Sequence, residues 1–171
     1  MIYLVSACLM GENCKYNGGN NRNERVLAFC REAVKKGNQV VAVCPESLGG
    51  LESPRLPSEI QEGSGEDVLT GDALVKDAQG GDLTQAFIAG AERALRMAVE
   101  ETERYFLSSI QAGAQKVGPM PVEAILKARS PSCGKGMIYD GSFSGGLREG
   151  NGVAAALLMK NGVRVITEEE L

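Results

Sequence analysis

Apolar residues along this sequence follow two spacings, one typical of buried strands and the other typical of helices. Four short runs are almost continuously apolar, as expected for strands that are covered on both faces. Between these runs, apolar residues recur every three or four positions, which is the spacing of a helix with one buried face. The four predicted strands are Ile2–Ser6, Gln39–Cys44, Val122–Ala128 and Val163–Thr167.

The segments between the predicted strands carry signals for the starts and ends of helices. Asn23 can cap a first helix that ends at Gly37, and Asp82 with Gln85 resembles the capping box that opens a second helix. A third, short helix ends at Gly162. Strands that alternate with helices predict an α/β fold, with a doubly wound, Rossmann-like sheet of about four parallel strands and flanking helices.

Two stretches do not follow this alternation. Residues 45–81 contain a Gly- and Pro-rich loop followed by an acidic, Gly-rich segment, and no strand or helix is predicted there. Residues 100–121 are too long for a simple loop, so we predict an extension of the preceding helix or an additional helical insertion. At 171 residues, the length favours a single domain over residues 1–171.

Charge and hydropathy restrict the partners and the compartment. The net charge of −4 and the pI of about 5.0 argue against a long nucleic acid as the main partner. The longest apolar runs fall far short of the ~20 residues needed to span a bilayer, so no membrane is expected. The N-terminus has no basic region before its first apolar run, which predicts no secretion signal and a cytoplasmic protein.

The sequence contains no histidine and five cysteines. The absence of His removes histidine-based zinc sites, Cys–His dyads and Ser–His–Asp triads together. In a reducing cytosol the cysteines would be free thiols or metal ligands rather than disulfides. Any acid–base chemistry must therefore come from carboxylates, Lys, Tyr or Cys.

Three cysteines occupy equivalent positions in the predicted sheet. Cys8 lies two residues beyond the first strand, Cys44 is the last residue of the second, and Cys133 follows the third in the turn RSPSCG. Because the carboxyl ends of parallel strands meet at one edge, we expect these thiols to point into one crevice, where such folds bind ligands. Cys30 lies on the apolar face of the first predicted helix and is interpreted as a core residue.

Three converging thiolates need a positively charged partner. At ~6 Å and an effective dielectric of about 20, each pair repels by roughly 3 kcal/mol, so bare thiols would stay protonated. Paired C-x-x-C motifs are absent, and no His can complete a tetrahedral zinc site. Three thiolates suit an iron–sulfur cluster that leaves one iron open as a Lewis acid. The alternative is Cys14, which as a fourth ligand would close the site.

Several polar residues are predicted to lie near this crevice. Glu46 follows Cys44 by two positions and is the best candidate for a general acid or base; the alternative is a solvated loop carboxylate. Ser130 could hydrogen-bond a substrate heteroatom or only the backbone of its own turn. Tyr16 could stack on a planar ring or be an ordinary half-buried tyrosine. Arg55 could bind a carboxylate or phosphate but is interpreted as a surface arginine.

Four stretches of the sequence together resemble the bacterial domain-of-unknown-function family that includes the thiouracil desulfurases. They are VSACLMGENCKYNGG, CPESLGGLESPRLPSEI, GGDLTQAFIAGAERAL and LKARSPSCGKGMIYDGSFSGG, and they occur in the order of the family. Residues 100–121 depart from the family, whose members usually pass from helix to strand more briefly.

The resemblance implies a 4Fe–4S cluster held by three cysteines, with the open iron binding the sulfur of a thiolated pyrimidine. It also implies an oxygen-sensitive, hydrolytic desulfidase with two catalytic groups beside the cluster. The family does not require a cysteine at the position of Cys14, which favours the open site. Carried over to this sequence, the ligands are Cys8, Cys44 and Cys133, and the catalytic groups are Glu46 and Ser130. Apart from the resemblance, substrate contacts are expected from Tyr16 and Ser132.

The predicted function is the removal of sulfur, as sulfide, from a thiolated nucleobase or nucleoside such as thiouracil. Two other functions stay open as alternatives. One is a non-catalytic iron–sulfur or metal-binding sensor or carrier, in which Cys14 closes the coordination. The other is a thiol-based sulfur carrier that passes persulfide between Cys8 and Cys133.

Overall fold

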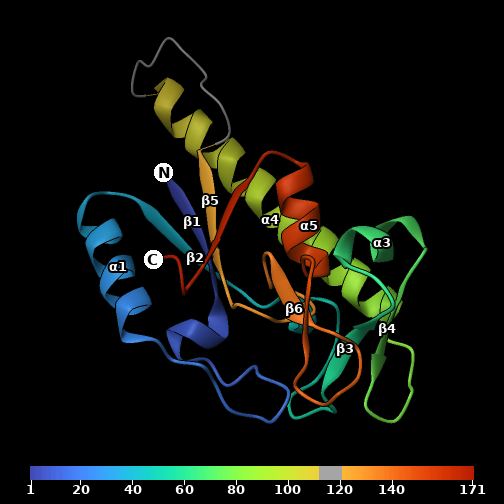
Figure 1. The fold of residues 1–171 in the computed structure, drawn as a ribbon. Helices are drawn as coiled ribbons and strands as arrows, with labels where there is room; N and C mark the ends of the chain where they lie inside the picture. Colours follow the sequence, from blue (N-terminus) through green and yellow to red (C-terminus); the bar gives the residue numbers. More distant parts are fainter. Residues whose placement is uncertain (112–120) are drawn as a thin grey trace.

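A four-stranded parallel sheet forms the centre of the fold (Figure 1). The computed structural model describes residues 1–111 and 121–171. Its central strands lie in the order β2-β1-β5-β8, and each neighbouring pair is parallel. They are β1 (Ile2–Ser6), β2 (Gln39–Val43), β5 (Val122–Leu126) and β8 (Arg164–Thr167).

This sheet confirms the predicted α/β fold and the positions of its strands. β1 spans the predicted residues, whereas β2 ends one residue early because Cys44 caps the helix that follows. β5 ends at Leu126, since the amide of Lys127 donates to the side-chain oxygen of Ser6 at 3.0 Å. These two differences occur at the carboxyl edge of the sheet, whereas β8 starts one residue later than predicted, at Arg164.

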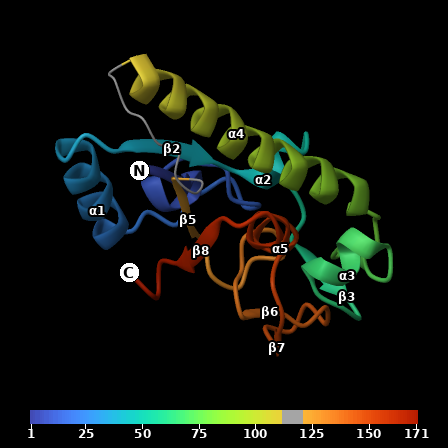
Figure 2. The ribbon, with the colours of Figure 1, turned by 90° about the horizontal axis from the view of Figure 1, so that it is seen from above.

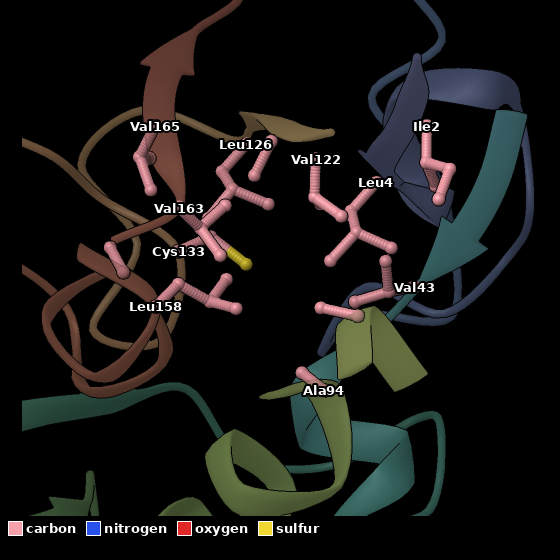
Figure 3. Close-up of a cluster of buried hydrophobic side chains, with 13 residues drawn as sticks. Ile2, Leu4, Val43, Ala94, Val122, Leu126, Cys133, Leu158, Val163 and Val165 are labelled. Carbon is pink, nitrogen blue, oxygen red and sulfur yellow. The ribbon is translucent and has the colours of Figure 1, made fainter. Parts of the chain in front are cut away.

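Helices cover both faces of the sheet, because alternate residues of each strand point to opposite sides. Val5 packs against α1, whereas Ile2 and Leu4 belong to the buried cluster beneath α4 and α5 (Figure 3). Figure 2 shows β2 between α1 and α4. The three helices are α1 (Glu24–Lys35), α4 (Thr84–Gln111) and α5 (Val153–Lys160).

The start of α1 follows the predicted cap, whereas the start of α4 uses Asp82 but, among the described residues, no bond from the predicted partner Gln85. The Asn23 side chain accepts hydrogen bonds from two amides of the first turn of α1, at 2.9 and 3.2 Å. At the start of α4, the Thr84 amide donates to Asp82 Oδ1 at 2.9 Å. α4 then continues to Gln111, so the first part of the predicted 100–121 insertion extends this helix, and residues 112–120 lie outside the described residues. No helix within residues 1–111 and 121–171 is long and apolar enough to cross a membrane.

Residues 45–81, for which no element was predicted, contain two short helices and an antiparallel hairpin. Each element has only four to six residues, which is too short for a hydrophobic period to stand out. A second hairpin and a 3-10 turn were missed for the same reason. These elements are η1 (Ala7–Met10), α2 (Pro45–Leu48), β3 (Ser58–Gln61), α3 (Gly65–Thr70), β4 (Leu74–Asp77), β6 (Met137–Tyr139) and β7 (Leu147–Glu149).

Two glycines let the short helix α2 lie directly against α4. A Cβ atom on Gly90 would overlap the carbonyl oxygen of Pro45, and a Cβ atom on Gly49 would overlap the carbonyl oxygen of Ala86. Backbones approach this closely only where no side chain intervenes. The contact fixes α2 at the carboxyl edge of the sheet, beside the end of β2.

Candidate active site

A cavity of about 520 Å³ lies at the carboxyl edge of the sheet. β1 lies between β2 and β5, so the chain leaves β1 toward one neighbour and returns on its other side. Such a switch point in an open parallel sheet is a typical ligand site. Four of the five cysteines line the cavity, namely Cys8, Cys14, Cys44 and Cys133.

Cys8 lies in η1, the turn that directly follows β1. The turn ends at Gly11, whose φ of 102° lies in the left-handed region that glycine adopts readily. Asn21 holds the cysteine from the other side: its amide donates to Cys8 O at 2.9 Å, and its side-chain Nδ2 donates to Cys8 Sγ at 3.6 Å. A donor at the sulfur favours the thiolate form.

Cys44 is the N-cap residue of α2 and has an extended backbone. Pro45 follows at the first helical position, where its fixed φ suits a helix start. The Ser47 hydroxyl donates to Cys44 Sγ at 3.3 Å. The pKa of Cys44 is lowered to about 5, mainly by hydrogen bonding from Cys14 and next by that from Ser47.

Cys133 is held at the boundary between the cavity and the core by the turn that follows β5. Ser130 Oγ accepts hydrogen bonds from the amides of Ser132 and Cys133, both at 3.1 Å. Cys133 is 6% exposed, and burial raises the pKa of its thiol. Figure 3 shows its sulfur among the apolar side chains between the sheet and its helices. Cys133 therefore belongs to both the core and the cavity lining.

Cys14 lies beside Cys8 and Cys44 in the same cavity. The interaction of its thiol with the two neighbouring thiols lowers the pKa of Cys8 and Cys44 and raises the pKa of Cys14 itself. Its carbonyl oxygen accepts a hydrogen bond from Arg55 Nη2 at 3.2 Å. The fold thus brings Cys14 together with the predicted ligands.

Glu46 lines the cavity from α2 and is paired with Arg55. Arg55 Nε donates to Glu46 Oε2 at 2.9 Å, and Nη2 donates to the same oxygen. The side chain of Arg55 is only 11% exposed, so its interpretation as a surface arginine was wrong. Burial raises the pKa of Glu46, and the positive charge of Arg55 offsets only part of this effect. A raised pKa suits a group that accepts and returns a proton near neutral pH.

Of the three other predicted site residues, two line the cavity and one does not. Ser130 and Tyr16 line the cavity, and Tyr16 is 40% exposed. Ser132 is 2% exposed and is not among the described residues that line the cavity. Its carbonyl oxygen accepts the amides of Ala154 and Ala155 at 2.9 and 3.2 Å, so it joins the Cys133 turn to the start of α5.

Three charged residues that the sequence did not single out also line the cavity, namely Lys15, Lys127 and Glu59. Lys127 follows β5, and its Nζ donates to Glu168 and to the carbonyl oxygen of Ala128. Its position at the end of an apolar run could have identified it. Glu59 lies in the four-residue strand β3, where no sequence signal marked it.

The donor set suits an iron–sulfur cluster, because such clusters are held by cysteine thiolates and four thiols line the cavity. Among the residues that the structure describes, no three His, Cys, Asp or Glu side chains could hold one ion together. A 4Fe–4S cluster takes thiolate ligands on different irons, so its cysteines need not meet at one point. A cavity of about 520 Å³ lined by four thiols meets this requirement.

The fold and the site define an α/β protein with a cysteine-lined cavity at the switch point of its parallel sheet. The sequence model of the 2-thiouracil desulfurase family matches residues 3–170, and the chain belongs to this family. The resemblance that the four sequence stretches predicted is thereby confirmed.

Two relatives cover almost the whole chain. The solved structure of the 4Fe-4S-dependent thiouracil desulfidase TudS is 33% identical and superposes with a TM-score of 0.73, covering 99% of this chain and 91% of that one. The uncharacterized protein YbbK of Bacillus subtilis (strain 168) is 45% identical over 168 residues, covering 98% of this chain and 96% of YbbK.

Proposed function

We propose that this protein hydrolyses the thiocarbonyl group of a thiolated pyrimidine base or nucleoside, such as thiouracil, and releases sulfide. The single observation that carries the proposal is the convergence of Cys8, Cys44, Cys133 and Glu46 on one cavity. Membership of the 2-thiouracil desulfurase family and similarity to a 4Fe-4S-dependent thiouracil desulfidase support it.

Cys8, Cys44 and Cys133 would hold a 4Fe–4S cluster as its three protein ligands. When bound, such a cluster with one iron free of protein ligands supplies a Lewis acid for the sulfur of the substrate. The protein keeps these thiols in place through Asn21, through the cap of α2 and through the Ser130 turn.

Glu46 is the group that moves protons in this proposal. Arg55 occupies Oε2 of its carboxylate, and no hydrogen bond to Oε1 occurs among the described residues. Oε1 can therefore take a proton from the attacking water and return it when sulfide leaves. The overall reaction exchanges the C=S sulfur for the oxygen of one water molecule, without oxidation or reduction.

Ser130 and Lys127 orient the reactants. Ser130 Oγ already accepts two amide hydrogen bonds, so its own hydroxyl hydrogen is the part that can bind a substrate atom. Lys127 brings positive charge to the cavity and lowers the pKa of Cys8, although less than Cys14 and Asn21 do. Tyr16, which lines the cavity, would contact the substrate ring.

Anaerobic reconstitution tests the proposal. The reconstituted protein should bind about four irons and release one sulfide per 2-thiouracil consumed, with uracil as the other product. Cys30→Ala is the matched control, because Cys30 lies in the core beneath α1 rather than in the cavity. A protein that binds the iron but leaves 2-thiouracil and related thiolated pyrimidines unchanged would contradict the proposal.

A second candidate function is a non-catalytic cluster carrier or sensor, and the position of Cys14 favours it. Cys14 lies beside Cys8 and Cys44, so it could act as a fourth thiolate and leave no iron open. Mössbauer spectra distinguish the two, because an iron without a thiolate ligand differs from the other three. Four equivalent thiolate-bound irons would favour the carrier.

A further inference from the structure

A second carboxylate, Glu59 of β3, lies in the wall of the same cavity. Glu59 is 7% exposed, and its Oε2 accepts the amides of Gly141 and Phe143 at 2.8 and 3.0 Å. Both amides belong to the loop between β6 and β7, which lies beside β3 (Figure 1). Glu59 thus fastens this loop to β3.

The fastened loop places an aromatic ring in the cavity wall. Phe143 lines the cavity and has a φ of 56°, a left-handed conformation that bulky residues rarely adopt. Two interactions hold the conformation: the bond from its own amide to Glu59, and the bond from Gln61 Nε2 to Gly141 O at 3.1 Å. Strained backbone that is held in place beside a cavity indicates a functional role.

The second carboxylate oxygen of Glu59, Oε1, differs from Oε2 in its hydrogen bonding. Within the part of the chain that the structure describes, no group donates a hydrogen bond to Oε1. No buried side-chain nitrogen or oxygen of the described residues lacks a partner, so Oε1 is accessible, and Glu59 lines the cavity. An ionised carboxylate oxygen in this position can only accept hydrogen bonds. A complementary ligand therefore brings a donor to Oε1 and a flat face to Phe143.

We infer that Glu59 and Phe143 form the ring-binding subsite of the cavity, in which Glu59 Oε1 accepts a ring N–H and Phe143 contacts the face of the ring. The inference rests on the proposed function, because thiolated pyrimidines carry a ring N–H next to the thiocarbonyl carbon. Replacing that N–H by N–CH₃ leaves Glu59 Oε1 covered by the ligand without a hydrogen-bond donor. The subsite thus selects pyrimidines that are unsubstituted at this nitrogen.

Uracil and its two N-methyl derivatives test the subsite without turnover, because they have no sulfur to remove. Their affinities for the reconstituted protein are measured by titration calorimetry. We expect one of the two derivatives, 1-methyluracil or 3-methyluracil, to bind roughly 10- to 100-fold more weakly than uracil. Methylation at the recognised nitrogen removes a hydrogen bond to a charged group. Equal affinities for all three compounds, or no binding of uracil, would overturn the subsite.

Glu59→Gln separates hydrogen bonding from steric effects. Its side-chain oxygen can still accept the two loop amides, while its NH₂ group turns the cavity-facing acceptor into a donor. The variant should bind uracil as weakly as the discriminated methyl derivative, within about twofold. Discrimination that persists in Glu59→Gln would have a steric cause and would remove Glu59 from the subsite.

Two further variants complete the test. Glu62→Gln removes the same charge from an exposed residue near the end of β3 and should leave all three affinities unchanged. Phe143→Ala should weaken binding of all three compounds by the same factor, because it removes a contact with the ring face; unchanged affinities would exclude Phe143. If the protein discriminates between uracil and a methyl derivative but releases no sulfide from 2-thiouracil, the subsite is supported and the desulfidase proposal is overturned. If it releases sulfide but binds all three compounds equally, the desulfidase proposal is supported and the subsite is overturned.

Discussion

Arg55 joins the carboxylate of Glu46 to the backbone of Cys14. Its Nε and Nη2 donate to Glu46 Oε2, and Nη2 also donates to the carbonyl oxygen of Cys14 at 3.2 Å. Its own amide donates to the carbonyl oxygen of Tyr16 at 2.6 Å. One residue therefore holds both Glu46, the proposed proton-transfer group, and the loop that carries the fourth cysteine of the cavity.

Arg55→Gln should destabilise the fold and change the pH dependence of catalysis. Removing one partner of a buried ion pair costs about 3–5 kcal/mol in the free energy of unfolding. Because Arg55 lowers the pKa of Glu46, its loss should raise that pKa further and move the acid limb of the pH–rate profile to higher pH. Chemical denaturation and kcat/KM between pH 5 and 9 measure the two effects.

The matched control for Arg55→Gln is Arg22→Gln. Arg22 pairs with Glu24, but the two side chains are 58% and 70% exposed. Exposed ion pairs contribute about 0–1 kcal/mol to stability. Arg22→Gln should therefore have nearly the same free energy of unfolding and the same pH–rate profile as the wild type. An unchanged pH profile in Arg55→Gln would mean that Glu46 does not set the acid limb.

Glu46→Gln should bind iron normally and lose turnover. A neutral amide keeps the shape of the side chain but cannot take a proton, and general acid–base groups contribute roughly 10²–10⁴-fold to the rate. Sulfide release from 2-thiouracil and iron content per protein are the two measurements. Near-normal sulfide release would exclude Glu46 from the mechanism, whereas loss of iron would make it a ligand.

Cys14→Ser and Cys8→Ser should behave differently, although the two cysteines lie side by side. In the open-site proposal, Cys8→Ser loses the cluster and Cys14→Ser keeps it, because only Cys8 is a required ligand. Iron content and the visible spectrum after anaerobic reconstitution measure the difference. Loss of the cluster in both variants would support the closed, four-thiolate site of the carrier.

The parallel sheet and the meeting of three cysteines were predictable from the sequence, because both follow from local patterns. Apolar runs identify strands, and Cys8, Cys44 and Cys133 all lie at or beyond strand ends that share one edge. Cys14 is eight residues beyond the end of β1, and only the folded path of its loop brings it to the same cavity.

The ion pair between Arg55 and Glu46 and the contact between Glu59 and Phe143 could not be predicted in the same way. Arg55 lies between two prolines, which suggested an exposed loop, and its burial depends on pairing with Glu46 across that loop. Glu59 belongs to the four-residue strand β3, and the partner strand β4 follows in the sequence only after helix α3. The role of Glu59 depends on Phe143, which is 84 positions away in the sequence. Contacts of this kind leave no periodic signal.

Gly90→Ala should damage the site although Gly90 does not line the cavity. In an isolated helix, alanine is favoured over glycine by about 1 kcal/mol. Here the added Cβ would overlap the carbonyl oxygen of Pro45, a backbone atom that cannot rotate away. Relief requires α2 to shift, and α2 carries Glu46 and is capped by Cys44.

We therefore expect Gly90→Ala to lower the free energy of unfolding by about 1–3 kcal/mol, as overpacked cores do, and to retain less iron after desalting. For a chain of this size each kcal/mol lowers the melting temperature by about 2–4 °C, which thermal unfolding followed by circular dichroism resolves. Glu92→Ala, an exposed position on the same helix, should melt within about 0.5 kcal/mol of the wild type. A more stable Gly90→Ala protein with full iron content would show that helix propensity outweighs the α2–α4 contact and that this contact does not position Cys44 and Glu46.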